Sequence, residues 1–418
     1  MKKIRRKIYD ISKKTGDKFG FDLPYFVENG FWMLLNQGVI LLGGLATSIL
    51  FARYFSKDVY GQYQFVLSII AFFSFFSVPG LNPALIRSIA NDNQGDYKPA
   101  VKFSFKYSLI GSIFVLITAF YYYFYLQKTT IALALMSASV FFPLLFSFDK
   151  WQAFLKGQEK FAFLTRNLII QTAGKTILIL SAILLFPDNL LVVVIAYLFG
   201  TAFFHILWYV KSSKLPKNNK KGKDTFSYAG FITKLGILNT LVNNFDKLLI
   251  GILDIKALAV YSIALGLINI IKSFIKSISA ITFPKFAKYN ITVSFKQKML
   301  IFFTGIVIAT IFYFIADNLI LLLYTDKYLP SAHYFKLFVF ITPLFMISSV
   351  LSKKVLANKN KSKLIHLKIT IPIITLLSSV TVYIVSKNID YFIFTKFFVF
   401  NILNFLLLSF SVKKKHTV

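Results

Sequence analysis

The chain of 418 residues alternates between long apolar stretches and short polar gaps. A helix of about 20 mainly apolar residues is needed to cross the hydrocarbon core of a bilayer. Twelve stretches of this kind lie near residues 31–52, 63–86, 103–125, 129–149, 165–186, 190–210, 228–253, 257–281, 299–323, 333–352, 364–386 and 390–411. The pattern predicts an all-α membrane protein with twelve transmembrane helices.

Basic residues gather in every second gap between these stretches. When the first few residues of each stretch are counted with the gap beside it, 35 of the 48 Lys and Arg lie on one side, 7 on the other and 6 inside the stretches. Cytoplasmic loops carry the excess of Lys and Arg. We therefore expect a multi-pass protein of the bacterial inner membrane with both termini in the cytoplasm.

The longest polar gap divides the chain into two halves of six spans. The expected order is a basic amphipathic cytoplasmic segment (1–22), an N-terminal six-helix lobe (23–210), a cytoplasmic linker (211–225), a C-terminal six-helix lobe (226–411) and a cytoplasmic tail (412–418). Matched positions recur about 200 residues apart: Tyr63 with Tyr261, Pro83 with Pro284, and Pro143 with Pro343. Six spans give both halves the same orientation, so we expect parallel repeats with a site at their interface.

Composition narrows the partners and the chemistry. The net charge of +32 lies mostly in loops that face anionic headgroups, so anionic phospholipids rather than nucleic acid are the expected counterpart. Zero cysteine excludes disulfides and thiolate chemistry, and the four histidines show no metal-ligand spacing. We expect no cofactor, no metal and no catalytic residue.

Three segments carry a resemblance to a known family. They are residues 52–90 (ARYFSKDVYGQYQFVLSIIAFFSFFSVPGLNPALIRSIA), residues 245–288 with Asp246, Tyr261 and Pro284, and LYTDKYLPSA (323–332) followed by KKVLANKNKSK (353–363). In this order they resemble polysaccharide flippases, a branch of the multidrug/oligosaccharidyl-lipid/polysaccharide exporter superfamily. The resemblance implies two parallel repeats in a MATE-like fold around a central cleft.

The same resemblance implies a function and partners. Members of this family move a polyprenyl-diphosphate-linked oligosaccharide repeat unit across the inner membrane by alternating access, for O-antigen, capsule or exopolysaccharide synthesis. The implied partners are the lipid-linked oligosaccharide, with a polysaccharide polymerase and a chain-length regulator as further candidates. The resemblance leaves open the sugar repeat and the coupling ion, which is a proton, sodium or none.

Polar stripes inside the spans supply the candidate site. An ionisable side chain at mid-bilayer needs a partner or a water-filled cavity, and stripes on the fifth, seventh and eighth spans cannot face lipid. The candidates for a cationic, substrate-binding cleft are Gln171, Lys175, Asn243, Lys247, Lys272 and Lys276. Lysine there would act as a point-charge partner of a diphosphate. The alternative is that Lys272 pairs with an acid and that Lys276 and Lys234 extend to the cytoplasmic interface.

The remaining charges have separate interpretations. Asp246, the only acid deep in a span, either pairs with a basic residue on another helix, such as Arg53, or titrates as an ion-coupling carboxylate. Arg53 and Arg87 lie at opposite mouths and are candidate gates. Lys396 is expected to extend to the outer interface, and Asp149 to be solvated at a cytoplasmic helix end.

Two other function classes remain to be weighed. A cation-coupled multidrug exporter of the same superfamily would use the same fold, but such exporters need a buried acid, whereas this predicted cleft is rich in lysine. A membrane polysaccharide polymerase or glycosyltransferase would need a sizeable outer loop or paired acids, and every predicted outer gap is short. A peptidoglycan-precursor flippase resembles a branch with fourteen helices, which twelve spans do not fit. The sequence therefore favours a carrier over an enzyme.

Overall fold

The chain folds into long helices, and the computed structural model describes residues 23–280, 293–357 and 365–410. The first half contains α2 (Leu23–Tyr54), α3 (Lys57–Phe73), η1 (Ser74–Ser77), α4 (Leu81–Ala90), η2 (Gln94–Asp96), α5 (Tyr97–Phe124), α6 (Thr129–Ser147), α7 (Lys150–Gly157), α8 (Phe161–Leu185) and α9 (Leu190–Ser212). The second contains α10 (Thr225–Leu253), α11 (Ile255–Ala280), α13 (Phe295–Tyr324), η3 (Asp326–Tyr328), α14 (Ser331–Val339), α15 (Thr342–Ala357), the π-helical turn η4 (His366–Thr370), α17 (Ile371–Ser386) and α18 (Ile389–Phe410). The expected terminal segments 1–22 and 412–418, and Pro284, lie outside the described residues.

Most of these helices can cross a membrane. Within the described residues, ten are long and apolar enough, and eleven if α14 and α15, which meet at a bend of 51°, form one span. The sequence prediction of twelve counts α10 as well. That helix has 29 residues but is interrupted by Asn, Asp and Lys side chains, which make it too polar for the same criterion. The count of twelve therefore stays a prediction that depends on α10.

Side-chain caps define several helix starts. The Ser56 hydroxyl accepts from Val59 N at the start of α3, and Asn189 caps α9 in the same way. Ser294 and Gln297 form a reciprocal capping box at α13. Asp254 alone separates α10 from α11, and its carboxylate accepts from two backbone N–H groups of α11. Short capped turns of this kind hold successive helices antiparallel.

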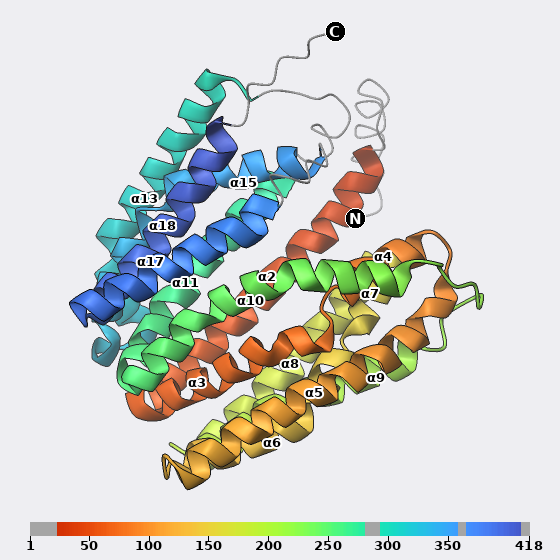
Figure 1. Ribbon diagram of the computed structural model, residues 1–418, viewed down its shortest axis with the longest axis horizontal. Coiled ribbons are helices and arrows are strands. Elements are labelled where there is room, and N and C mark those ends of the chain that lie inside the picture. The colour runs from red at the N-terminus through yellow and green to blue at the C-terminus, as the bar shows by residue number, and fades with distance from the viewer. Residues whose placement is uncertain (1–22, 281–292, 358–364, 411–418) are drawn as a thin grey trace, which may run out of the picture.

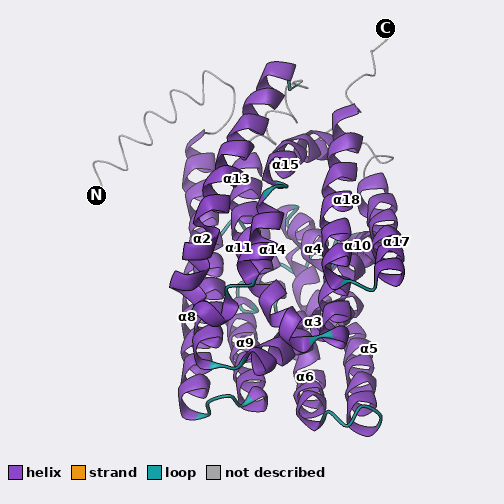
Figure 2. Ribbon diagram, turned by 90° about the vertical axis from the view of Figure 1, so that its left-hand side faces the viewer, coloured by secondary structure: helices purple, strands orange, loops and turns teal. Residues whose placement is uncertain are grey.

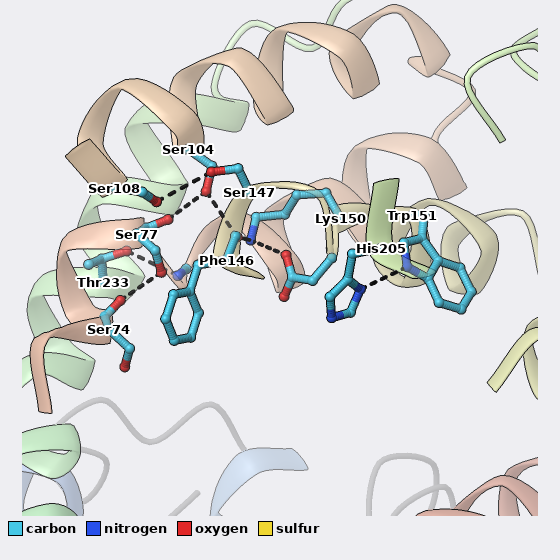
Figure 3. Close-up of polar contacts among 12 residues, drawn as sticks. Ser74, Ser77, Ser104, Ser108, Phe146, Ser147, Lys150, Trp151, His205 and Thr233 are labelled. Atoms are coloured by element: carbon cyan, nitrogen blue, oxygen red, sulfur yellow. Dashed lines mark hydrogen bonds and ion pairs between the residues drawn. The ribbon is translucent and has the colours of Figure 1, made fainter. Parts of the chain in front are cut away.

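Two spans of the first half are broken, and hydrogen bonds join the two breaks. One break lies at Val78, whose φ of 56° is rare for a β-branched residue, between η1 and α4. The other lies at residues 148–149, between α6 and α7. The Ser104 hydroxyl of α5 lies 2.8 Å from the Ser77 carbonyl and 3.3 Å from the Phe146 carbonyl, so it serves both breaks (Figure 3). Carbonyls freed by a helix break inside a membrane need such donors.

The helices form two lobes with α10 between them. Figure 1 shows α3, α5, α6, α8 and α9 side by side on one side of the molecule, and α11, α13, α15, α17 and α18 on the other. Figure 2 shows the long helices running nearly parallel. Across the division, α3 packs against both α10 and α11. The largest apolar core continues through this contact and contains both Tyr63 and Tyr261, the pair matched in the repeat analysis.

The segment between the lobes is bound to the first half at Asp96. This carboxylate is fully buried and accepts hydrogen bonds from the Ser88 hydroxyl at 2.5 Å, the Thr225 hydroxyl at 2.7 Å and the Gly222 N–H at 3.0 Å. All three donors meet Oδ2 and offset much of the cost of burying the charge, whereas Oδ1 has no partner among the described residues. Asp96 therefore fixes the end of the linker and the start of α10 to the N-terminal lobe.

Hydrogen bonds to the loop before η2 extend this attachment. Gly95 N donates to the Lys220 carbonyl at 2.8 Å, and the Asn218 amide donates to Asp92 at 2.9 Å. The hydrogen bond from Gln94, together with those from Asn218 and Lys220, lowers the pKa of Asp92 below its ordinary value. The expected linker 211–225 is thus hydrogen-bonded to the surface of the first half.

A polar cavity as the candidate functional site

A polar cavity lies among the helices of the first half and α10. It consists of two adjoining compartments of about 450 and 440 Å³. Both are lined by Gln64, Leu67, Gln152, Tyr197, Thr201 and His205, which form their common wall. The first compartment extends to α6 and α10, and the second to α2 and α8. The site therefore lies mainly inside the N-terminal lobe rather than midway between the lobes.

Neutral polar groups and aromatic rings make up most of the wall. Gln64 and Gln152 face both compartments, and Gln171 faces the second, where its buried carbonyl oxygen has no hydrogen-bond partner among the described residues. Tyr63 stacks on Phe51 with ring centroids 4.2 Å apart. A wall that combines a few placed polar groups with aromatic surface is typical of small-molecule sites.

Two lysines contribute positive charge, one in each compartment. Lys175 of α8 lines the second compartment, with Nζ 5.2 Å from the centroid of the Tyr197 ring. Lys247 of α10 lines the first beside Asn244. Within the described part of the chain, no carboxylate lies within ion-pair distance of either ammonium. These two predicted candidates are thus available to an anion.

Asp149 lies in the wall at the junction of α6 and α7, where its side chain is 24% exposed. The fourth span continues past residue 149 through α7 to Gly157, so the carboxylate lies within the span. It pairs with Lys150 at 2.7 Å, and Lys150, only 1% exposed, also donates to the Phe146 carbonyl at 2.8 Å (Figure 3). The carboxylate therefore brings its own counterion to the cavity.

His205 also reaches the cavity, and its orientation is set from α7. The indole Nε1 of Trp151 donates to Nδ1 of His205 at 3.2 Å (Figure 3). The histidine ring is buried and lines both compartments. Sequence reasoning missed this residue because it sought metal-ligand spacing. A histidine within an apolar span was the available signal, as were Gln64 and Gln152.

Asp246 belongs to a buried cluster that joins three helices. Its carboxylate, on α10, pairs with Lys396 of α18 at 2.7 Å and accepts a short hydrogen bond from the hydroxyl of Tyr261 on α11. The exposed fractions of the side chains are 3% for Asp246 and 15% for Lys396. The expectation that Lys396 extends to the outer interface was therefore wrong, and Lys396 takes the place suggested for Arg53. The second buried carboxylate oxygen has no partner among the described residues.

The other predicted cations do not reach the cavity. Lys272 lies in the C-terminal lobe, with Nζ 4.0 Å from the centroid of Phe397, and Lys276 is exposed with Nζ 5.8 Å from the centroid of Phe345. Asn243 is exposed, whereas its neighbour Asn244 lines the wall. The predicted lysine stripes are therefore divided between two places in the fold.

The two candidate gate residues, Arg53 and Arg87, each contact a helix that is distant in sequence. Arg53 donates to the carbonyls of Leu322 and Leu323, the last turn of α13, at 2.7 and 3.2 Å. In return, Nζ of Lys327 donates to the Phe55 carbonyl just after α2, at 2.7 Å. Each cation thus caps the carboxyl end of a helix of the other lobe, where carbonyls lack partners.

Further contacts join the lobes near the carboxyl ends of α2 and α13. Arg87 lies elsewhere. The rings of Tyr60 and Tyr328 meet edge to face, and the hydroxyls of Ser48 and Tyr324 are 3.0 Å apart. Arg87 is exposed on α4, 5.2 Å from the ring centroid of Tyr228 on α10. The end of the lobes near α2 and α13 is thus closed by direct contacts.

Comparisons with known proteins agree with this architecture. The model of the family described as "Polysaccharide biosynthesis protein" matches residues 26–290. A Shigella flexneri protein assigned as an O-antigen transporter is 22% identical over 295 residues, covering 65% of this chain and 69% of that protein.

Solved structures show the same fold. The lipid II flippase MurJ in an inward closed conformation matches with a TM-score of 0.72 at 15% identity, covering 93% of this chain and 88% of that one. The eukaryotic MATE transporter AtDTX14 matches with a TM-score of 0.64 at 14% identity, covering 93% and 96%. The predicted fold class, an all-α MATE-like membrane protein, is confirmed.

Proposed function

Since the chain belongs to the polysaccharide biosynthesis protein family, the polysaccharide flippases of the multidrug/oligosaccharidyl-lipid/polysaccharide exporter superfamily, we propose that its cargo is a polyprenyl-diphosphate-linked oligosaccharide repeat unit. The protein would move this cargo from the inner to the outer leaflet of the bacterial inner membrane by alternating access. O-antigen, capsule or exopolysaccharide synthesis would then use the product, with a polymerase and a chain-length regulator as partners.

The observation that carries the proposal is the charge pattern of the cavity. Lys175 and Lys247 offer two ammonium groups to a diphosphate, and lysine is a common phosphate partner. The neutral amides and the tyrosine rings between them suit sugars, whose hydroxyl groups donate and accept hydrogen bonds and whose C–H faces pack on rings. A neutral glycan attached to an anionic diphosphate fits both properties.

The alternative, a cation-coupled drug exporter, is less well supported. An organic cation needs a carboxylate that is free to meet it, but Asp149 is already paired with Lys150 and Asp246 with Lys396. The positive charges at the cavity would repel such a cargo. Gating by Arg53 and Arg87 and ion coupling by Asp246 are further parts of our proposal.

Lys175→Ala and Lys247→Ala test the cargo. Each removes one ammonium from the cavity, and the loss of one charged contact to a phosphate weakens binding about tenfold or more. We expect less surface polysaccharide at a normal membrane abundance, measured by polysaccharide blots and immunoblots, and a milder effect of Lys175→Arg. Lys234→Ala, an exposed lysine outside the cavity, is the matched control.

Lys272→Ala tests whether Lys272, which lies outside the cavity, contributes to transport as Lys175 and Lys247 are expected to do. If Lys272 belongs to the cargo path, this variant also loses surface polysaccharide at normal abundance, and Lys272→Arg is milder. A fall in abundance equal to the fall in activity would make Lys272 a structural partner of the rings around it. Parent-level polysaccharide in both Lys175→Ala and Lys247→Ala would place the anion site outside this cavity.

The proposed orientation has its own test. We place both termini and the linker in the cytoplasm, and the chain contains no cysteine, so single reporters can be introduced freely. Lys220→Cys, at a side chain that is 70% exposed, should react with a membrane-impermeant thiol reagent only after the cells are permeabilised. Labelling in intact spheroplasts would contradict the proposed orientation and place the linker on the outer face.

A further inference from the structure

His205 occupies the wall that the two compartments of the cavity share. Lys175 lines only the second compartment and Lys247 only the first, whereas His205 lines both. Its neighbours in the common wall are the neutral side chains of Gln64, Gln152, Thr201, Tyr197 and Leu67. The wall that the two compartments share is therefore uncharged, and each of its side chains except Leu67 can form hydrogen bonds.

The contact with Trp151 determines the tautomer of His205. The indole N–H can only donate, so Nδ1 of His205, at 3.2 Å, must accept and carry no proton. The neutral ring then holds its proton on Nε2. Trp151 is fully buried and packs near Trp208, with ring centroids 6.3 Å apart, so the donor cannot easily turn away.

The proton on Nε2 is directed toward the cavity. Figure 3 shows the second ring nitrogen of His205 on the side of the ring away from Trp151. Among the described residues, no hydrogen-bond partner of this nitrogen is found, although the ring is only 7% exposed. This nitrogen is not among the fully buried side-chain atoms of the described residues, so it is accessible from the cavity that the ring lines and can donate to an acceptor there.

We propose that His205 donates a hydrogen bond from Nε2 to an acceptor oxygen of the cargo glycan, a sugar hydroxyl or an acetamido carbonyl. This inference rests on the proposed function and assigns the sugar end of the cargo to the common wall. Trp151 is a positioning residue, because it fixes the tautomer that donates. A fixed neutral donor discriminates between sugars by the position of their oxygens, and a site built to hydrogen-bond a group rejects analogues that lack it.

Binding of three probes to the purified, detergent-solubilised protein tests this inference. Geranyl diphosphate carries the diphosphate alone, and geranyl diphosphate linked to N-acetylglucosamine, or in a second probe to galactose, adds the sugar. We expect a sugar-bearing probe to bind more tightly to the parent protein. His205→Asn, whose shorter side chain can still accept from Trp151, should weaken only the sugar-bearing probe, by about fivefold to tenfold.

Two further variants separate donation from packing. His205→Gln can hold an amide N–H near the position of Nε2, so it should recover most of the affinity that His205→Asn loses. Trp151→Phe keeps an aromatic ring beside His205 but removes the N–H that fixes its tautomer, and should weaken binding of the sugar-bearing probe while leaving that of geranyl diphosphate unchanged. Melting temperatures in detergent identify any variant that fails to fold. The role of His205 is then judged from the variants that do fold.

The outcomes distinguish this inference from the proposed function. If the parent protein binds none of the three probes, the proposed function fails. If geranyl diphosphate binds but neither sugar adds affinity, or if His205→Asn weakens both probes equally, the role of His205 is overturned and the diphosphate site stands. Selective loss in His205→Asn with recovery in His205→Gln supports the inference.

Discussion

Asp246→Asn is expected to lower the free energy of unfolding by about 3–5 kcal/mol, because it leaves the ammonium of Lys396 buried without a counterion. Lys396→Met should cost about as much, since it strands the Asp246 carboxylate. Thermal or SDS unfolding in detergent measures both effects. The carboxylate joins α10 to α11 and α18, so the loss should extend to the whole C-terminal lobe.

The double variant Asp246→Asn/Lys396→Met distinguishes structure from coupling. With neither charge present, most of the stability should return, because a neutral pair of similar volume often replaces a buried ion pair without cost. Tyr261→Phe, which removes one hydrogen bond and keeps the ion pair, should cost only about 1 kcal/mol. If Asp246 also couples transport to an ion gradient, the stable double variant still loses gradient dependence in vesicles. Gradient dependence equal to the parent would limit Asp246 to a structural role.

The second large effect concerns the closed end of the lobes. Removing both reciprocal caps in Arg53→Ala/Lys327→Ala is expected to favour opening there, because each charged donor contributes about 1 kcal/mol to closure at an exposed site. Together, about 2 kcal/mol shifts the ratio of open to closed forms roughly thirtyfold. The reporter substitution Thr201→Cys in the cavity wall measures the opening through its labelling rate from the outer face of spheroplasts.

A matched control separates this effect from a general loss of charge. Lys336→Ala removes a lysine that pairs with Asp317 at 2.5 Å, within the C-terminal lobe, so it breaks no contact between the lobes. The labelling rate of the reporter thiol in this variant should match that in the parent. If the double variant also labels at the parental rate, the bonds of Arg53 and Lys327 do not hold this end closed, and Arg53 is not a gate.

Hydropathy predicted most of the fold, because a membrane span is a local property of the sequence. The break at residues 148–149 was missed, since the apolar stretch ends there in the sequence. Only tertiary contacts show that α7 stays buried: Trp151 and Phe154 lie in a core shared with α4, α8 and α9, while Lys150 turns its ammonium back to the Phe146 carbonyl and Asp149. A lysine normally indicates the end of a span, and nothing in its own sequence neighbourhood contradicts that interpretation.

The candidate site was predicted only in part, for a geometric reason. Helical spacing identified Gln171 and Lys175 on one face of α8, and both line the cavity. It could not tell which face of α10 meets which lobe, so Asp246 and Lys247, adjacent in sequence, point to different surroundings. Partners from distant spans, such as Lys396 and His205, depend on helix packing that periodicity alone does not encode.

The two halves are held together by hydrogen bonds of the linker and α10 as well as by the covalent chain. Asp96 takes two of its three donors from Gly222 and Thr225, and Thr233 of α10 accepts from Gly80 N at 3.0 Å. α10 is therefore bonded to the first half at one end and, through Asp246, to the second half at the other. Two polypeptides made from a gene divided near codon 220 should therefore still bind each other. Without the partner fragment, buried groups such as the Asp96 carboxylate would lose their hydrogen bonds. Because α10 is held by both lobes, any motion of one lobe relative to the other must also bend this helix.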